Sequence, residues 1–174
     1  MDGLQLASLE LKAHSEADLP FLLQLYTSVR RDEFAAANWP ESQLNLFLSE
    51  QFSAQYHYYC QHYSTDKFDI IYFQNQAVGR LFVDYWLDEH QEIRIVDISL
   101  MPEYRGIGIA SCLLEQLFIE AEALGLTVSI HVERNNPARV LYERLGFKLK
   151  TQTDEVYLLM EWRAENRVAA QLIP

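Results

Sequence analysis

The residues best suited to chemistry lie in a short glycine-containing stretch near the middle of the chain. It reads LMPEYRGIGIA from Leu100 to Ala110. Gly106 and Gly108 carry no Cβ atoms, so an anion could approach their backbone N–H groups closely. A helix beginning there would add unpaired N–H groups and the positive end of its dipole, and Arg105 could add a charge-assisted hydrogen bond. The stretch therefore predicts a site for a phosphate or pyrophosphate.

Hydrophobic periodicity predicts the elements that must position this stretch. From Glu92 to Leu100 the chain is rich in apolar and β-branched residues, which is typical of a strand. Apolar residues then recur at helical spacing from Ala110 to Leu124, and Gly125 follows where a left-handed helix cap is common. We therefore expect a strand, a turn and a helix, with both glycines of the turn in the first turn of that helix.

Two better-known phosphate loops are excluded by the residues that follow the glycines. A Walker A loop ends in Gly-Lys-Ser or Gly-Lys-Thr, whereas Ile109 and Ala110 stand here. A dinucleotide fingerprint needs glycine or alanine where Ser111 stands, and too few strands follow to build its doubly wound sheet. On this stretch alone, an ordinary strand-to-helix turn stays the alternative to a phosphate site.

A second motif downstream makes the pattern more specific. Leu100-x-Pro102-x-x-Arg105-Gly106-x-Gly108-x-Ala110 is followed by Asn135-x-x-Ala138-x-x-Leu141-Tyr142-Glu143-x-x-Gly146-Phe147. Together they resemble the acetyl-CoA motifs of the GNAT superfamily of N-acetyltransferases, and the resemblance lies within residues 93–147. It departs at Glu103 and Ile107, where the family often has side chains that can donate hydrogen bonds. Backbone amides and Arg105 would therefore carry more of the cofactor binding here.

The resemblance implies a fold and a co-substrate, acetyl-CoA, with no metal. The implied fold is one layered α/β or α+β domain over residues 1–174, with a mixed sheet of about seven strands, about four flanking helices and a splay between the fourth and fifth strands. In the splay, the central strand would pair with the pantetheine arm and place a backbone N–H near the thioester oxygen. The implied cofactor-binding residues are Ile98, Ser99, Leu100, Arg105, Gly106, Ile107, Gly108, Ile109, Ala110, Asn135, Ala138 and Tyr142.

The resemblance also assigns a catalytic role to Tyr142. A phenol has a pKa of about 10 in water, so it could give a hydrogen bond or a proton to the departing thiolate. The residue types alone favour a core tyrosine instead, because Tyr142 shares a helical face with Leu141 and Leu145. Asn135 has a similar alternative, since it could be only a turn residue.

A base must accept a proton from the attacking ammonium group, and carboxylates on or beside the central strands are the candidates. Asp97 is the first choice, with Glu92 and Asp84 as alternatives, although such residues are often plain ion-pair partners. Cys112 has no histidine partner nearby in the sequence, so we expect direct attack without a covalent enzyme intermediate.

Composition limits the partners and the compartment. The chain has 174 residues, 49% of them hydrophobic, which suits one domain with a sizeable core. Its net charge of −11 disfavours nucleic acid and anionic membranes and suits a cationic amine, although acidity also serves solubility. Cys60 and Cys112 lack paired spacing, and neither a signal peptide nor a membrane-spanning run is recognisable. We expect a cytoplasmic protein, with a homodimer left open.

The rest of the chain reads as alternating strands and helices. Helices within roughly residues 16–63 would border the acceptor site in the GNAT fold. In that region His57, Cys60 and His62 do not share one helical face, so a metal site is not expected. The other expected elements are a strand from Leu4 to Ala13, a polar loop or short helix from Arg30 to Trp39, a helix from Pro40 to about Tyr63, hairpin strands from Phe68 to Phe73 and Ala77 to Leu87, a strand from Leu126 to Val132, a short helix capped by Asn136, and a closing hairpin from Phe147 to Gln152 and Val156 to Trp162.

The leading functional hypothesis is transfer of the acetyl group of acetyl-CoA to a primary amine, on a small molecule, by direct attack in a ternary complex. One alternative is a protein acetyltransferase acting on an N-terminus or a lysine. A second alternative, from another class, is a non-catalytic regulatory module that binds acetyl-CoA.

Overall fold

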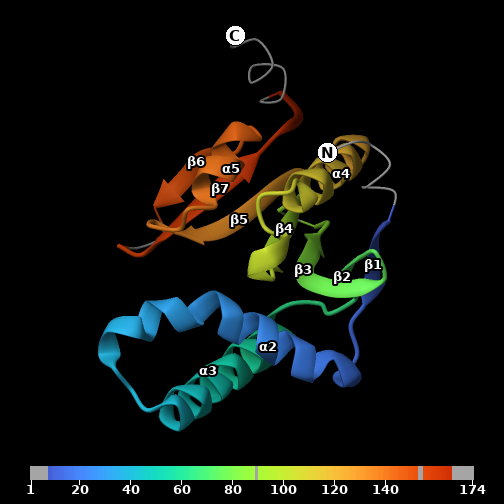
Figure 1. Cartoon of the computed structure of the whole chain (residues 1–174). Coiled ribbons are helices and arrows are strands. Elements are labelled where there is room, and N and C mark those ends of the chain that lie inside the picture. Colours follow the sequence, from blue (N-terminus) through green and yellow to red (C-terminus); the bar gives the residue numbers. More distant parts are fainter. Residues whose placement is uncertain (1–7, 89, 153–154, 166–174) are drawn as a thin grey trace. The chain divides into compact units, whose positions relative to one another are not determined.

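The computed structural model describes residues 8–88, 90–152 and 155–165, and Figure 1 follows them along the chain. The described helices are α2 (Leu19–Arg30), α3 (Glu41–His62), α4 (Ile109–Leu124) and α5 (Arg139–Arg144), with 3-10 turns η1 (Glu16–Asp18), η2 (Arg31–Ala37) and η3 (Pro102–Tyr104). The strands are β1 (Leu9–Ala13), β2 (Lys67–Phe73), β3 (Gln76–Trp86), β4 (Glu92–Leu100), β5 (Thr127–Glu133), β6 (Lys148–Gln152) and β7 (Tyr157–Trp162).

The strands form a seven-stranded sheet in the order β1-β2-β3-β4-β5-β7-β6. The sheet is mixed, because β1 pairs with β2 antiparallel while β4 pairs with β5 in parallel. The β4–β5 ladder runs from Glu92 opposite Thr127 to Ile95 opposite Ile130, and both strands continue beyond its last pair. The predicted layered fold with a mixed sheet, opening between its fourth and fifth strands, is confirmed.

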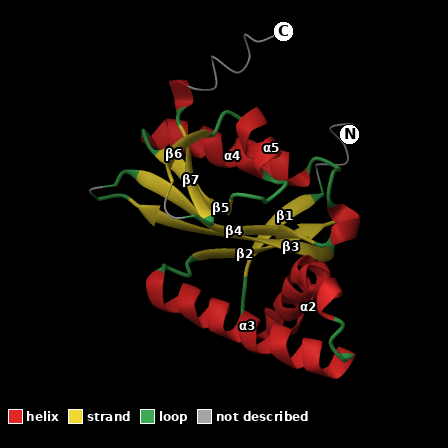
Figure 2. Ribbon diagram, turned by 90° about the vertical axis from the view of Figure 1, so that its left-hand side faces the viewer, coloured by secondary structure: helices red, strands yellow, loops and turns green. Residues whose placement is uncertain are grey.

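The chain packs as two compact units that alternate along the sequence. The first unit comprises Met1–Phe82 and Asp97–Ile109. Its core forms where α2 and α3, which lie side by side on one face of the first three strands, bury their apolar positions (Figure 2). Leu22 of α2 and Leu48 of α3 are buried there. In the strands that the helices cover, Phe68 of β2 stacks on Phe82 of β3 with ring centroids 4.2 Å apart.

The second unit comprises Val83–Val96 and Ala110–Pro174. Here α4 and α5 cover one face of strands β5, β7 and β6 (Figure 2). Phe118 of α4 stacks on Trp162 of β7 with ring centroids 4.3 Å apart, and the Phe147 ring lies 5.5 Å from the Phe118 ring. The apolar period read from the sequence therefore faces a buried sheet surface, as expected for an amphipathic helix.

Three predicted boundaries need correction or restriction. Gly106 and Gly108 precede α4 and do not form its first turn, because their φ angles of 72° and 94° are incompatible with a right-handed helix. The short helix that Asn136 was expected to cap begins only at Arg139. Asn136 instead caps the turn before it, where its side-chain oxygen accepts a hydrogen bond from the N–H of Ala138. The predicted first strand is described only from Leu9, and its residues 4–7 lie outside the described part.

Candidate functional site

The glycine stretch forms a loop between β4 and α4. Gly106 and Gly108 both adopt positive φ, a region that residues with a Cβ atom rarely enter. A Cβ at Gly106 would meet no described atom within 4 Å, so backbone conformation, more than space, requires this glycine. Arg105 donates from Nε to the carbonyl oxygen of Leu100 at 2.9 Å, which ties the loop back to the end of β4. Binding of an anion by the main-chain N–H groups of this loop stays a prediction.

The last residues of β4 are held against β3 by close backbone approach. The N–H of Met101 donates to the carbonyl of Val78 at 2.8 Å. Gly79 lies so near that a Cβ placed there would overlap the carbonyl oxygen of Ser99 and come within 2.7 Å of the Leu100 side chain. The main chain of Ile98, Ser99 and Leu100, where the pantetheine arm is expected, is therefore fixed from the β3 side.

Asp97 stands at the centre of a buried polar network in the first unit. Its Oδ2 atom accepts from Nη2 of Arg80 at 2.7 Å and from the hydroxyl of Tyr59 at 3.3 Å, while Oδ1 accepts from the Ser99 hydroxyl at 2.6 Å. Only 14% of the Asp97 side chain and 3% of the Arg80 side chain are exposed. Arg80 Nη2 also donates to the amide oxygen of Gln55 at 2.9 Å. Helix α3 and strands β3 and β4 thus meet at one ion pair.

The protonation state of Tyr59 follows from this setting. Burial, and then the negative charge of Asp97, raise the pKa of the Tyr59 phenol above its ordinary value. The phenol therefore stays protonated and acts as a donor to the carboxylate. For Asp97, the expected role as a base stays a prediction.

Tyr142 lies on α5 in the second unit. Its side chain is buried, with 4% exposed, and its ring packs edge-on against Phe147 with centroids 5.6 Å apart. The position is fixed by local bonds, because the N–H of Tyr142 donates to Ala138 and the N–H of Phe147 donates to the carbonyl of Tyr142. The helix ends where Gly146 adopts a φ of 95°. The ring therefore packs in the core of the second unit, as the residue types alone favour. Its catalytic role stays a prediction.

The remaining predicted cofactor residues divide between the two units. Ile107 and Ile109 belong to the first unit with the rest of the loop, and Ile109 is buried. Ala110, Asn135 and Ala138 belong to the second, where Asn135 is an exposed residue of the turn that precedes α5. Their contacts with a cofactor stay predictions.

Two alternative bases have other partners. Glu92 is 3% exposed and accepts from Nε and Nη2 of Arg94 at 3.0 and 2.6 Å and from the Ser129 hydroxyl at 2.9 Å. Asp84 accepts from the indole N–H of Trp86 at 2.8 Å. Both carboxylates thus have structural roles in the second unit.

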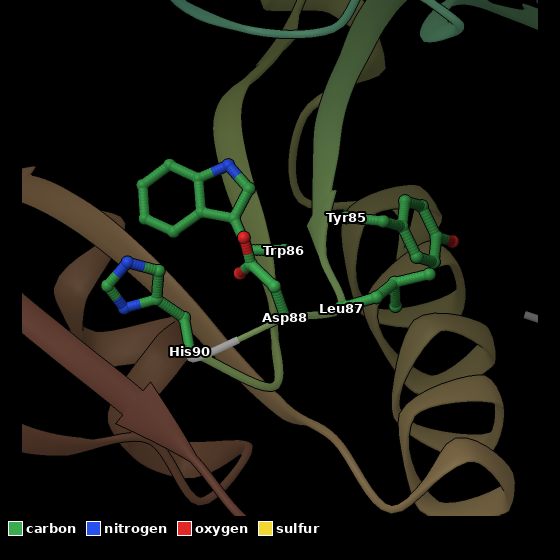
Figure 3. A pocket seen from close by; sticks show the side chains of 5 residues that line it. All are labelled: Tyr85, Trp86, Leu87, Asp88 and His90. Carbon is green, nitrogen blue, oxygen red and sulfur yellow. The ribbon is translucent and has the colours of Figure 1, made fainter.

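Two further possibilities for a site can be judged from side-chain grouping. Within residues 8–88, 90–152 and 155–165, no three histidine, cysteine or acidic side chains gather in a way that could hold a metal ion. A surface pocket lies at the end of β3, where Trp86, Asp88 and His90 point to one side and Tyr85 and Leu87 to the other (Figure 3). None of the predicted site residues lines it.

Sequence reasoning missed Arg80, Gln55 and Tyr59. Arg80 did carry a signal, because a charged residue between Val78 and Leu81 in an otherwise apolar strand needs a buried partner. The partners themselves come from α3, which lies about 20 residues away or more along the chain, and no local pattern predicts such a pairing.

The open mixed sheet and the glycine loop after β4 fit an acetyl-CoA-dependent acyltransferase domain, and comparison with known proteins identifies its family. Residues 64–149, about half of the chain, match the model described as an acetyltransferase (GNAT) domain. The chain belongs to the GNAT family.

Similarity to individual proteins is more distant. A [ribosomal protein bS18]-alanine N-acetyltransferase of Haemophilus influenzae is 34% identical over 74 residues, which are 42% of this chain and 49% of that protein. The chain thus matches about half the length of this curated relative.

Helices long and apolar enough to cross a membrane are not found among the described residues.

Solved structures resemble the chain over most of its length. The PaiA N-acetyltransferase of Thermoplasma acidophilum, in complex with coenzyme A, has a TM-score of 0.65 at 19% identity and covers 90% of this chain and 99% of its own. The spermidine N-acetyltransferase of Vibrio cholerae, in complex with coenzyme A and spermine, has a TM-score of 0.63 at 21% identity and covers 93% and 99%. At these identities the likeness concerns the fold.

Proposed function

We propose that this chain transfers the acetyl group of acetyl-CoA to a primary amine. The observation that carries the proposal is the positive-φ loop of Gly106 and Gly108 after β4, within the region that matches the GNAT acetyltransferase domain. Backbone N–H groups freed by glycine conformation suit a pyrophosphate, and Arg105 is anchored beside them. The coenzyme A complex of PaiA, which shares the fold, supports the same cofactor class.

In this proposal the residues of the chain divide the chemistry between a proton acceptor and a proton donor. Acetyl-CoA supplies an acyl carbon activated as a thioester. Asp97 takes a proton from the acceptor ammonium, directly or through water, so that the amine lone pair can form the new C–N bond. A main-chain N–H at the end of β4 stabilises the carbonyl oxygen, and the Tyr142 phenol hydrogen-bonds or protonates the sulfur as the C–S bond breaks.

The amine acceptor is proposed to be a small molecule. The net charge of −11 favours a cationic ligand, and the spermidine N-acetyltransferase of Vibrio cholerae acts on such an amine. A protein N-terminus is the second candidate, because the Haemophilus influenzae relative acetylates the alanine of a ribosomal protein. For the compartment, we keep the expectation of the cytoplasm.

The test measures thiol release from acetyl-CoA with a panel of polyamines, amino acids, aminoglycosides, aryl amines and peptides. Tyr142→Phe should lower kcat by about 100-fold or more, because a positioned general acid contributes a factor of that order. Tyr72→Phe is the matched control, since it removes a phenol from β2, and its kcat should stay within about 2-fold of wild type.

Two results would contradict the proposal. One is absence of turnover with every amine of the panel. The other is tight acetyl-CoA binding, measured by calorimetry, together with rates that Tyr142→Phe does not change. The second result would favour a regulatory module that binds acetyl-CoA without catalysis.

A further inference from the structure

The buried guanidinium of Arg80, in the first unit, has hydrogen-bond donors to which no partner is assigned among the described residues. Its Nη2 atom donates to Asp97 and to Gln55, at 2.7 and 2.9 Å. Its Nε and Nη1 atoms are buried, yet neither has a hydrogen-bond partner among the residues that the structure describes. Buried donors without partners are rare in folded proteins and call for a specific reason, such as a bound water or ligand. This one lies beside the carboxylate that we propose as the base.

Gln55 indicates which chemical group suits this guanidinium. The atom that contacts Nη2 is the oxygen of a carboxamide, the same group that a peptide bond or an amino acid amide presents. Gln55 reaches the site from α3, one of the two helices expected to border the acceptor. An acceptor oxygen could join or replace this amide oxygen with little change of chemistry, because guanidinium groups only donate.

The charges of the pair fit an amine that lies next to an oxygen. Asp97 presents a negative charge and Arg80 a positive one, with their contacting atoms 2.7 Å apart. An α-amino group and the adjacent carbonyl or carboxylate oxygen of an amino acid present the complementary pattern at similar spacing. A polyamine would instead bring further positive charge against the guanidinium, which is unfavourable in a buried setting.

We propose that Arg80 is an acceptor-binding residue that hydrogen-bonds a carbonyl or carboxylate oxygen next to the reacting amine. This inference rests on the proposed acetyl transfer and narrows its acceptor to α-amino acids, their amides or peptide N-termini. Asp97 then faces the amine and Arg80 the oxygen. The Tyr59 and Ser99 hydroxyls hold the Asp97 carboxylate in place between them.

The test compares two amines of similar shape, alaninamide and isopropylamine, which lacks the oxygen. Arg80→Lys keeps a positive charge for Asp97 but loses the planar set of donors. It should lower kcat/KM for alaninamide by about 10- to 100-fold, mainly through KM, because a hydrogen bond to a charged group is lost. The value for isopropylamine should fall less, since it reports only the effect on Asp97, so the ratio of the two kcat/KM values should drop by about 10-fold or more.

Arg31→Lys is the matched control. Arg31 also donates to a carboxylate and to an amide oxygen, at 2.7 Å to Glu41 and 2.6 Å to Asn45, but its side chain is 37% exposed. It should leave both amines unchanged. Alanine, alaninamide and an alanine-initiated tripeptide, compared in the wild-type protein, distinguish a free carboxylate from an amide or peptide carbonyl. Thermal unfolding of each variant separates loss of binding from loss of fold.

Direct binding separates failure of this inference from failure of the proposed function. Alaninamide is titrated into the wild-type protein with coenzyme A present, and the Nε–H resonance of Arg80 is followed by NMR. Turnover of both amines with equal sensitivity to Arg80→Lys, or with none, would overturn the inference and leave acetyl transfer standing. Arg80-dependent binding without turnover would support Arg80 as an acceptor-binding residue and would contradict the proposed acetyl transfer. Absence of both turnover and a shift of that resonance would overturn both.

Discussion

Each unit buries an arginine against a carboxylate, but the two arginines use their remaining donors differently. In the first unit Arg80 contacts Asp97 at 2.7 Å, and in the second Arg94 contacts Glu92 at 2.6 Å. All three nitrogen atoms of Arg94 donate, with Nη1 placed 2.7 Å from Nδ1 of His131. Two nitrogen atoms of Arg80 have no partner within the described part of the chain. One network is complete without a ligand and the other is not.

The completeness of the second network also fixes a tautomer. Arginine has no acceptor atom, so the Nδ1 atom of His131 must accept from the guanidinium and carry no proton. Both arginines also make a cation–π contact, Arg94 at 4.8 Å from the centre of the Trp86 ring and Arg80 at 5.2 Å from that of Phe82, so only the hydrogen bonds distinguish them. Every strong interaction of Arg94 is therefore made inside the unit, which is the pattern of a structural residue. An arginine with spare buried donors is the better candidate for binding.

The largest expected effect is on stability in the second unit. Arg94→Met removes the nearer charge partner of Glu92, whose side chain is 5% exposed, and leaves the Lys150 ammonium at 4.0 Å. Breaking a buried pair from one side costs about 3–5 kcal/mol, so denaturant unfolding should show a loss of that size. Arg80→Met should cost clearly less, because Asp97 keeps two hydroxyl donors and partial exposure, and because the unpartnered donors disappear.

The double variant Arg94→Met with Glu92→Leu checks the cause of the loss. It removes both charges, and it should recover part of the stability, since replacing a whole buried pair by apolar residues is often neutral. Equal losses for the two single arginine variants would end the distinction drawn between the networks.

The next effect concerns the close approach that supports the first network. Gly79 precedes Arg80 on β3, and a Cβ there would overlap the carbonyl of Ser99, whose hydroxyl holds Asp97. Gly79→Ala should therefore push β4 away and destabilise the protein by about 1–3 kcal/mol, the usual cost of overpacking. Thermal unfolding measures the loss.

Gly106→Ala is a useful contrast to Gly79→Ala. At Gly106 the space is open but φ is 72°, so backbone conformation alone penalises the change. Its cost in stability should be smaller, of about 1 kcal/mol, with a larger proportional effect on acetyl-CoA binding. A Gly79→Ala protein as stable as the wild type would show that β3 and β4 do not need this close approach.

The sequence predicted the strands and long helices because their signals are local. The apolar run from Glu92 to Leu100 matches β4, and the helical period up to Leu124 matches α4 and its Gly125 cap. The position of the glycines relative to α4 was wrong, since composition cannot tell a glycine in a helix from one in a left-handed turn. The roles of Tyr142 and Asp97 came from the family motif and stay predictions.

The two arginine networks could not be predicted, because each joins elements that are distant along the chain. Arg80 meets Gln55 and Tyr59 of α3 only after β3 and that helix have packed. Which arginine would have spare donors depends on the geometry of every neighbour at the site. Hydrophobic periodicity predicts which face of a strand a side chain lies on, but it does not predict which hydrogen bonds that side chain makes.

The smallest expected effect concerns Glu161, which lies at the exposed edge of the second network. Burial alone would raise the pKa of Glu161, but hydrogen bonds from Lys150 and Arg163 outweigh it and hold the pKa below its ordinary value of 4.5. A carboxylate with a lowered pKa in the folded state contributes stability that is present above about pH 4.5 and is lost as pH falls through the folded value.

Lys150→Met should therefore reduce the fall in melting temperature on acidification from pH 5. The change should correspond to about 1 kcal/mol or less, because the Lys150 side chain is 41% exposed and such contacts are screened by solvent. Lys148→Met is the matched control: Lys148 lies opposite Glu161 in the β6–β7 ladder, but Lys150 and Arg163 are what lower the pKa of Glu161, so most of the wild-type pH dependence should remain. If Lys150→Met also kept it, the lysine would not be what lowers the pKa of Glu161. The second network would then end at Glu92 and Arg94, while its contrast with Arg80 would stand.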